Sequence, residues 1–283
     1  MLRINKYYSN KLVERIVIYL AVILFLLWTL LPFYWMFVTS VKPETAMYQK
    51  QFSIWPKNFT LENYTKLITK TNFLLYFKNS IVVTMITTFL SLIISVLAAF
   101  ASAKLKFKGN KLIGQAIFFV YLLPAAVLVI PLYLILNQLH LIDSLLSLIV
   151  SFPVAMVPFC TWLLIGYFNS IPKELDEAAM IDGCSRIGTL FRITLPLSAP
   201  GLVATWVFSF VNAWNRYLFP LVFTSKESQR LLPIGLKMFI TQDVFFWGQL
   251  MSAAILTALP TIILFAIVQK FVVQGLTAGA VKG

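Results

Sequence analysis

The sequence predicts an all-α fold of the polytopic membrane class, with six transmembrane helices and both termini in the cytoplasm. The chain of 283 residues is 60% hydrophobic and 12% charged, whereas soluble domains are about 45–50% apolar and about 25% charged. Its mean hydropathy is +0.86. Long apolar runs recur along the chain without the polar–apolar alternation of barrel strands. These values exclude a soluble enzyme and a disordered chain, because the charged residues are too few to cover a soluble surface or to keep a chain unfolded.

Six apolar segments each reach the length of about 20 residues that a helix needs to cross the hydrocarbon core. We expect spanning helices at 16–38, 80–103, 112–136, 144–168, 198–224 and 249–272, within one transmembrane domain over 1–283. These segments must be helical, since hydrocarbon offers no hydrogen-bond partner to a free backbone group.

The first segment also has the basic start of a signal peptide. Its apolar run is longer than a signal-peptide core of about 7–15 residues, and no small-residue cleavage site follows Trp35. We therefore expect an uncleaved first helix. Prolines such as Pro124 and Pro153 lie within the later segments, where they either kink a moving pathway or are ordinary prolines of membrane helices.

The distribution of Lys and Arg gives the expected orientation. With the N-terminus inside, the cytoplasmic segments, together with Lys270 at the inner end of the last span, contain 13 of these residues and the outer segments contain nine. Four lysines lie within 104–111, a very short cytoplasmic loop, where basic residues bias topology most strongly. The first outer loop, about 42–78, contains six lysines and runs against this rule. The balance favours both termini inside.

The sequence lacks the patterns of common catalytic and ion-coupled sites. It contains no Gly-Lys dipeptide, and hence no phosphate-binding P-loop. One histidine, His140, and two cysteines exclude a Ser-His-Asp triad and a histidine metal cluster. None of the ten acidic residues lies well within an expected span, where proton and sodium sites usually occur. We expect no catalytic residue, metal or cofactor in this chain, so uphill transport would need an external energy source.

The longest expected cytoplasmic connection, 170–196, contains a short helix at 172–182. Pro172 suits the first helical turn, and Gly183 can take the left-handed position that follows a last turn. Acidic residues in the first turn favour the positive end of the helix dipole. Both ends of this helix are therefore specified locally.

The two faces of this helix differ in chemistry. Leu175, Ala178 and Ala179 recur at helical spacing and form a small apolar face. Four acidic residues lie within nine positions: Glu174, Asp176, Glu177 and Asp182. The helix could lie on the inner leaflet as an interfacial helix, but anionic lipid would repel this many acidic residues. The acidic cluster favours a protein partner.

This loop resembles the EAA loop of ABC importer permeases, because it keeps every spacing of that pattern, Glu177-Ala-Ala-x3-Gly183-x9-Ile193-x-Leu195-Pro196. The full spacing, placed before the penultimate expected helix, is specific. Further segments are similar to carbohydrate importer permeases of the maltose-transporter type, and the C-terminal one to the smaller, six-helix permease: 98–109, 131–133, 162–164 and 269–283. The resemblance covers about residue 10 to the end of the chain.

The resemblance implies a transporter assembled from several chains. A second homologous permease would form a heterodimer with this one, two cytoplasmic ABC ATPase subunits would bind ATP and magnesium, and an extracytoplasmic sugar-binding protein would deliver the sugar. The helix at 172–182 would lie in a cleft of one ATPase, with Glu177 as its polar anchor. Ala178 and Ala179 would form the close-packing face and Gly183 the turn. The residues expected to couple to the ATPase are Glu174, Glu177, Ala178, Ala179, Asp182 and Gly183.

The C-terminal tail, 273–283, is a second expected contact with the ATPases. The resemblance implies that it reaches between them through four residues: Gly275, Leu276, Thr277 and Gly279. The glycines of this segment equally permit a frayed, flexible end.

The fifth expected helix contains a polar segment that could contact substrate: Asn212, Trp214, Asn215, Arg216 and Tyr217. In a continuous helix Asn212, Asn215 and Arg216 share one face. Amide and guanidinium groups can hydrogen-bond sugar hydroxyls, and the aromatic rings could stack on a pyranose. Equally, Arg216 could extend to the outer interface, with the rings in the interfacial aromatic belt. The resemblance adds that the partner permease could hold most of the sugar.

Together these features predict the permease subunit of an ABC importer in the cytoplasmic membrane of a bacterium or archaeon. The expected substrate is a mono-, di- or oligosaccharide, or a related polyol or glycerol-phosphate compound. A stand-alone channel or facilitator for small polar solutes is the alternative, although it leaves the EAA loop without a purpose. An intramembrane enzyme lacks a nucleophile–base pair. The basic residues are dispersed between the spans, so the lipid bilayer is an expected partner and nucleic acid is not.

Overall fold

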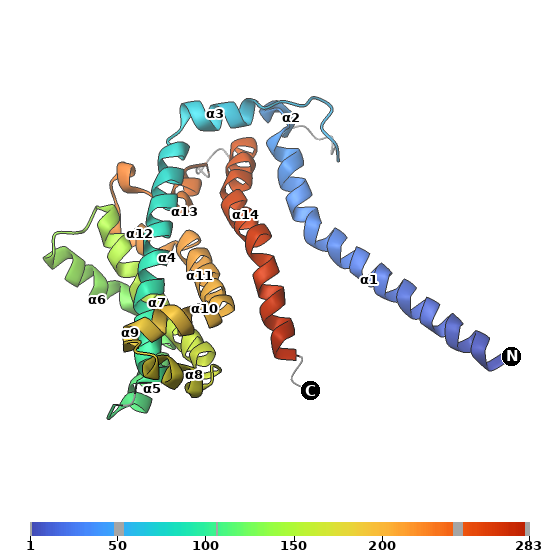
Figure 1. Cartoon of the computed structure of the whole chain (residues 1–283). Helices are drawn as coiled ribbons and strands as arrows, with labels where there is room; N and C mark the ends of the chain where they lie inside the picture. Colours follow the sequence, from blue (N-terminus) through green and yellow to red (C-terminus); the bar gives the residue numbers. More distant parts are fainter. Residues whose placement is uncertain (1, 48–53, 106, 240–245, 281–283) are drawn as a thin grey trace. The chain divides into compact units, whose positions relative to one another are not determined.

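The computed structural model describes residues 2–47, 54–105, 107–239 and 246–280 (Figure 1). Within these ranges the chain forms helices and connecting turns, without a β-strand. The α-helices are α1 (Leu2–Ser40), α2 (Glu44–Met47), α3 (Glu62–Lys70), α4 (Phe73–Lys104), α5 (Asn110–Tyr121), α6 (Ala125–Gln138), α7 (Leu145–Asn169), α8 (Lys173–Ile181), α9 (Arg186–Thr189), α10 (Leu195–Leu197), α11 (Ala199–Trp214), α12 (Leu218–Phe223), α13 (Leu232–Gly235) and α14 (Trp247–Ala280). A π-helical turn, Leu190–Thr194, separates α9 from α10.

Four of the described helices are long and apolar enough to cross a bilayer: α1 over Val13–Ser40, α4, α7, and α14 over Trp247–Gln269. Two bent pairs raise the number to six if each pair is one span. The first pair is α5 with α6, bent by 98°, and the second is Arg186–Leu197 with α11, bent by 83°. The expected all-helical membrane fold is confirmed.

Contacts divide the chain into two compact units. One unit comprises Met1–Thr71 and Phe239–Leu256, and the other comprises Asn72–Met238 and Thr257–Gly283. All the candidate site residues lie in the second unit.

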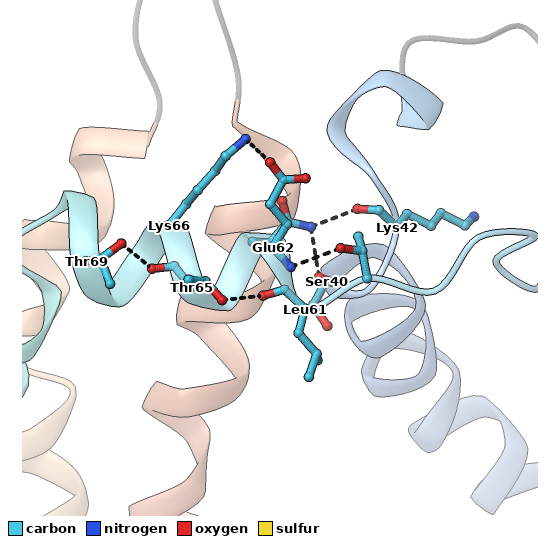
Figure 2. A network of polar contacts seen from close by, with 9 residues as sticks. Ser40, Lys42, Leu61, Glu62, Thr65, Lys66 and Thr69 are labelled. Carbon is cyan, nitrogen blue, oxygen red and sulfur yellow. Dashed lines mark hydrogen bonds and ion pairs between the residues drawn. The ribbon is translucent and has the colours of Figure 1, made fainter.

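The first unit contains a buried polar side chain, Asn63 of α3. Its side-chain amide donates to the carbonyl oxygens of Ser40, at 2.9 Å, and Lys42, at 2.8 Å. The two acceptor residues, Ser40 and Lys42, are labelled in Figure 2. These bonds join α3 to the C-terminal end of α1 and satisfy carbonyl groups that the end of a helix leaves free. Upstream, α1 exposes its apolar side chains from Val13 to Phe33, as a helix in contact with lipid does.

The second unit is built on α4, α7 and α11, which pack side by side (Figure 1). The face of α4 in this contact carries small polar side chains that are buried: Ser80, Thr84, Thr87, Thr88, Ser91 and Ser95. Small side chains let helix axes approach closely in a membrane, where packing rather than water exclusion drives association. One apolar cluster surrounds Phe152 and Phe219, and another surrounds Leu164 and Phe168 beneath the π turn.

The helix boundaries agree with the sequence prediction for α7 and differ elsewhere. The helix expected at 80–103 begins at Phe73. Its additional turns are fixed by Asn79, whose side-chain amide donates to the carbonyl oxygens of Ser228, at 2.9 Å, and Arg230, at 3.1 Å. These partners lie far along the chain, so the local sequence did not reveal this start. The sixth helix, expected at 249–272, extends from Trp247 to Ala280.

Two expected spans are broken in the structure. The segment 112–136 divides at Pro124, whose φ of −58° and ψ of 132° place it outside both α5 and α6. The segment 198–224 divides after Trp214 and resumes at Leu218. In a continuous helix the ring of Pro220 would clash with the carbonyl of Arg216, four residues earlier. The prediction of one uninterrupted fifth helix was wrong for this reason.

Candidate functional site

Helix α8, Lys173–Ile181, lies within one residue of the helix expected at 172–182. Pro172 precedes it in an extended conformation, with φ −53° and ψ 135°. At the other end Gly183 has a φ of +87°, a conformation that costs a residue with a Cβ about 1–2 kcal/mol. The N–H of Gly183 donates to the carbonyl of Met180 at 3.1 Å, and the N–H of Cys184 donates to that of Ala179 at 2.9 Å. This pair of bonds is a Schellman motif, so the predicted helix and its glycine turn are confirmed.

A buried ion pair joins α8 to the last turn of α4. The ammonium nitrogen of Lys104 lies 2.7 Å from a carboxylate oxygen of Asp176, and the two side chains are 5% and 12% exposed. The same nitrogen donates to the carbonyl of Ile171 at 3.0 Å, just before α8. Since α4 is one of the helices long and apolar enough to cross a bilayer, this pair connects the short helix directly to a candidate membrane span.

The ion pair orients the faces of α8. Asp176 and Ala179 are three residues apart and both turn toward the rest of the chain, where Ala179 is 7% exposed. Leu175, Ala178 and Glu177 are exposed. The prediction that Ala179 shares an outward apolar face with Leu175 and Ala178 is therefore wrong, because Ala179 is buried with Asp176, the partner of Lys104.

The acidic cluster is also smaller on the surface than the sequence indicated, since Asp176 is buried in its ion pair. The other three acidic residues remain exposed: Glu174, Glu177 and Asp182. Exposed apolar side chains lie beside them, with Met180 at 45% and Ile181 at 86% of their surface accessible. We call this set, from Glu174 to Asp182 without Asp176 and Ala179, the outward face of α8.

A second polar feature lies at the break between α11 and α12. Val211, Asn212, Asn215 and Arg216 line a shallow, wide-open hollow of about 330 Å³. The amide nitrogens of Asn212 and Asn215 donate to backbone carbonyls four residues earlier, at 3.0 and 2.9 Å. Each amide therefore keeps its oxygen as an acceptor and a second N–H as a donor. The three polar residues expected to share a face do line one hollow, although the helix ends at Trp214.

Arg216 is seated against two aromatic rings. Its guanidinium carbon lies 5.6 Å from the ring centre of Phe152 and 5.1 Å from that of Phe219, both within reach of a cation–π contact. Its Nε atom is buried and has no hydrogen-bond partner. Phe152 and Phe219 were not among the predicted site residues, because nothing in the local sequence pairs either ring with this guanidinium.

The two aromatic residues of the polar segment have different surroundings. Tyr217 is 39% exposed, whereas Trp214 is 3% exposed. The ring of Trp214 stacks on Phe210 at 5.9 Å, and its N–H donates to the carbonyl of Thr257 on α14 at 3.1 Å. The prediction that Trp214 could stack on a sugar is therefore wrong, because its ring is enclosed by its own chain.

The predicted tail residues lie in the last turns of α14. The backbone is helical as far as Ala280, which includes Gly275, Leu276, Thr277 and Gly279. Their contact with an ATPase stays a prediction.

A family model described as "Binding-protein-dependent transport system inner membrane component" matches residues 91–278, which include the whole of α8 and of the break after α11. The chain belongs to this family. The resemblance that the EAA loop indicated is therefore confirmed, and the chain is an inner membrane component of a transport system.

Curated members of the family align over most of this chain. The trehalose/maltose transport system permease protein MalG of Thermococcus litoralis is 36% identical over 277 residues, covering 97% of this chain and 99% of that protein. The sulfoquinovosyl glycerol transport system permease protein SmoH of Agrobacterium fabrum is 39% identical over 254 residues, covering 90% and 89%. The inner membrane ABC transporter permease protein YcjP of Escherichia coli is 36% identical over 277 residues, covering 97% and 99%.

A solved structure supports the same fold for this inner membrane component. A chain in the crystal structure of a bacterial ABC transporter involved in the import of the acidic polysaccharide alginate superposes with a TM-score of 0.81. The superposition covers 91% of this chain and 96% of that chain, at 24% sequence identity. The two chains share the helical architecture described above.

Proposed function

We propose that this chain is the permease subunit that forms half of the carbohydrate pathway in an ATP-driven importer. Relatives at 36% and 39% identity are named for trehalose/maltose and sulfoquinovosyl glycerol transport, which supports a carbohydrate substrate. Its partners are a second homologous permease, two cytoplasmic ATPases that bind ATP and magnesium, and an extracytoplasmic binding protein. The substrate class includes mono-, di- and oligosaccharides and related polyol or glycerol-phosphate compounds.

The proposed topology has six spans and cytoplasmic termini in the membrane of a bacterium or archaeon. The bent pair α5 and α6 forms the third span. We assign the fifth span to α11 with α12, which leaves Arg186–Leu197, the partner of α11 in the second bent pair, in the cytoplasmic coupling loop. One transmembrane domain then covers 1–283, with the coupling loop at 170–196 and the tail at 273–283. In this orientation α8 faces the cytoplasm, where the ATPases lie. Gly275, Leu276, Thr277 and Gly279 follow the sixth span on the same side.

The observation that carries the proposal is the construction of α8. The helix is closed at both ends, is tied to α4 by the Lys104–Asp176 ion pair, and keeps an outward face that its own chain leaves uncovered. A docked ATPase would cover Glu177, Ala178 and Ile181. Because the ion pair is buried and short, movement of α8 with the ATPase would be passed to α4 rather than absorbed by a flexible loop.

The experiment is ATP-driven uptake by the complete importer in proteoliposomes, together with the amount of ATPase that co-purifies. Glu177→Lys reverses a charge on the outward face, so we expect loss of both ATPase retention and uptake. Glu62→Lys is the matched control, since Glu62 is an exposed acidic residue on α3 whose ion pair with Lys66 lies on the surface and contributes little. Normal retention and uptake in Glu177→Lys would refute coupling through α8. Uptake that needs no ATP would favour a stand-alone facilitator.

A further inference from the structure

Arg216 is a membrane-embedded cation without an acidic counterpart in the helices around it. It is the single Lys or Arg in the sequence between residues 193 and 225. The helices that pack at this level, α4, α7, α11 and α12, contain no Asp or Glu at all. Within the described part of the chain, Arg216 forms no ion pair. A charge at this depth is costly unless it is paired, and such residues commonly mark a substrate path.

The two aromatic contacts position the guanidinium but do not use its hydrogen bonds. The rings of Phe152 and Phe219 lie 5.6 and 5.1 Å from its central carbon, and ring faces offer no oxygen acceptor. Phe219 is fully buried in the apolar cluster that it shares with Phe152, so the two rings are fixed in position by their packing. A guanidinium has five N–H donors in a planar fork, and its buried Nε has no partner. The guanidinium of Arg216 is therefore held in place while its N–H donors remain available to a ligand.

The remaining lining of the hollow favours a carbohydrate with an anionic group. One N–H of each of Asn212 and Asn215 is engaged by a backbone carbonyl, which leaves two amide oxygens as acceptors, and one N–H on each amide as a donor, for hydroxyl groups. The hollow, of about 330 Å³, thus combines acceptors for hydroxyls with one unpaired cation. A neutral sugar would use the acceptors and leave the cation unpaired. A carboxylate, sulfonate or phosphate would accept two parallel bonds from the guanidinium fork.

We propose that the hollow at the break between α11 and α12 is a subsite for the anionic group of an acidic carbohydrate, bound by Arg216. This inference rests on the proposed import of carbohydrate and adds the charge class of the substrate. Asn212 and Asn215 bind hydroxyl groups next to the acidic group. The break fixed by Pro220 is part of the subsite, since it turns Asn215 and Arg216 out of the helix end.

The test measures the equilibrium binding of carbohydrate probes to the complete importer in nanodiscs of zwitterionic lipid. The external binding protein is left out, because its own selectivity would mask that of the subsite. The probes are matched pairs: cellobiouronic acid with cellobiose, and sulfoquinovosyl glycerol with glucosyl glycerol. We expect at least one acidic probe to bind at least tenfold more tightly than its neutral partner. Arg216→Gln abolishes this preference and changes the affinity for the neutral probe less than twofold. Arg216→Lys retains part of the preference, because it keeps the charge but not the fork.

Lys226→Gln is the matched control, since it removes one positive charge from an exposed side chain on the adjacent loop and should leave the preference unchanged. The subsite proposal is overturned if the wild type shows no acidic preference, or if Arg216→Gln or Lys226→Gln alters acidic and neutral probes alike. It is also overturned if Arg216→Gln releases bound phospholipid or weakens the contact with the companion permease, because Arg216 would then bind a lipid or the partner protein rather than substrate.

The failure of the subsite can be distinguished from failure of the proposed function. If the subsite fails but the same preparation takes up a neutral sugar with ATP, the proposed function stands. Absence of any ATPase and of any carbohydrate binding would instead refute the proposed function.

Discussion

Replacement of Asp176 by asparagine should detach α8 from α4 while leaving the outward face of α8 unchanged. The substitution keeps the size of the side chain and removes its charge. Lys104 is then left buried without a charged partner, with the carbonyl of Ile171, at 3.0 Å, and the neutral asparagine oxygen as its acceptors. The helix keeps its own caps at Pro172 and Gly183, so the perturbation acts on its attachment rather than on its formation.

The magnitude follows from the burial of the pair. Removing one partner of a buried ion pair costs about 3–5 kcal/mol, and with side chains 5% and 12% exposed this pair belongs near that range. An asparagine oxygen still accepts one bond from the ammonium group, so we take the lower value of about 3 kcal/mol. Since about 1.4 kcal/mol corresponds to a factor of ten, the detached population of α8 should rise about 150-fold.

Hydrogen exchange of the α8 amides, measured on the assembled importer, reports that population directly. The control is the double variant Lys104→Met with Asp176→Leu, which replaces both charges by apolar groups of similar size. Such replacements are often neutral or stabilising, so the double variant should exchange more slowly than Asp176→Asn. ATP-driven uptake should fall in Asp176→Asn and recover at least partly in the double variant.

The reasoning is refuted if Asp176→Asn exchanges like the wild type, because the ion pair would then contribute no attachment. It is equally refuted if the double variant loses as much stability as Lys104→Met and Asp176→Leu lose together when each is made alone, since this would show that the two residues act independently.

Three further outcomes are expected. Gly183→Ala should destabilise α8 by about 1–2 kcal/mol through backbone strain alone, because a Cβ there meets nothing within 4 Å. Gly183→Asn should destabilise it less. Equal hydrogen-exchange rates of the α8 amides in the two variants would contradict backbone strain as the cause. Trp214→Phe should lower the free energy of unfolding by about 1–2 kcal/mol, because the hydrogen bond of the indole N–H is lost. Substrate selectivity should stay unchanged; altered selectivity would show that Trp214 contacts the substrate. The backbone N–H groups of Ser225 and Lys226 donate to Asp143 and hold the pKa of that carboxyl below its ordinary value. This contact is complete above the ordinary pKa of about 3.9 and is lost as pH falls through the lower folded value. Amide exchange at Ser225 should therefore be faster in Asp143→Asn than in the wild type at pH 6, and the difference should vanish in acid; a difference that persists would exclude the carboxylate as its cause.

Helix α8 could be predicted closely because its signals are local. Pro172 and Gly183 specify its ends within two turns of chain, and the spacing from Glu177 to Pro196 identified the family. The face that turns inward could not be predicted, because it depends on Lys104, which lies on another helix far along the sequence. The sequence places Lys104 in a basic loop that indicates membrane orientation, and nothing in that loop indicates Asp176 as its ion-pair partner.

The polar break illustrates the same division. Its position could have been predicted from Pro220, whose ring is incompatible with a helix that continues through Arg216. The apolar run across 198–224 predicted one continuous helix, although Pro220 is incompatible with it. The burial of Trp214 depends on Phe210 and on the carbonyl of Thr257, and the latter belongs to a different helix. A tryptophan beside polar residues is compatible with a substrate path and with a core, and only the tertiary contact distinguishes them.

Cysteine cross-linking to the ATPase tests the central claim most directly. In a Cys184→Ser background, Ala178→Cys places a thiol on the outward face of α8, whereas Ala179→Cys places one on the buried face. With single cysteines introduced around the receiving cleft of the co-expressed ATPase, our account predicts strong cross-linking from position 178 and little from position 179. Equal yields from the two positions, or none from position 178 in an importer that still transports, would contradict docking through this face.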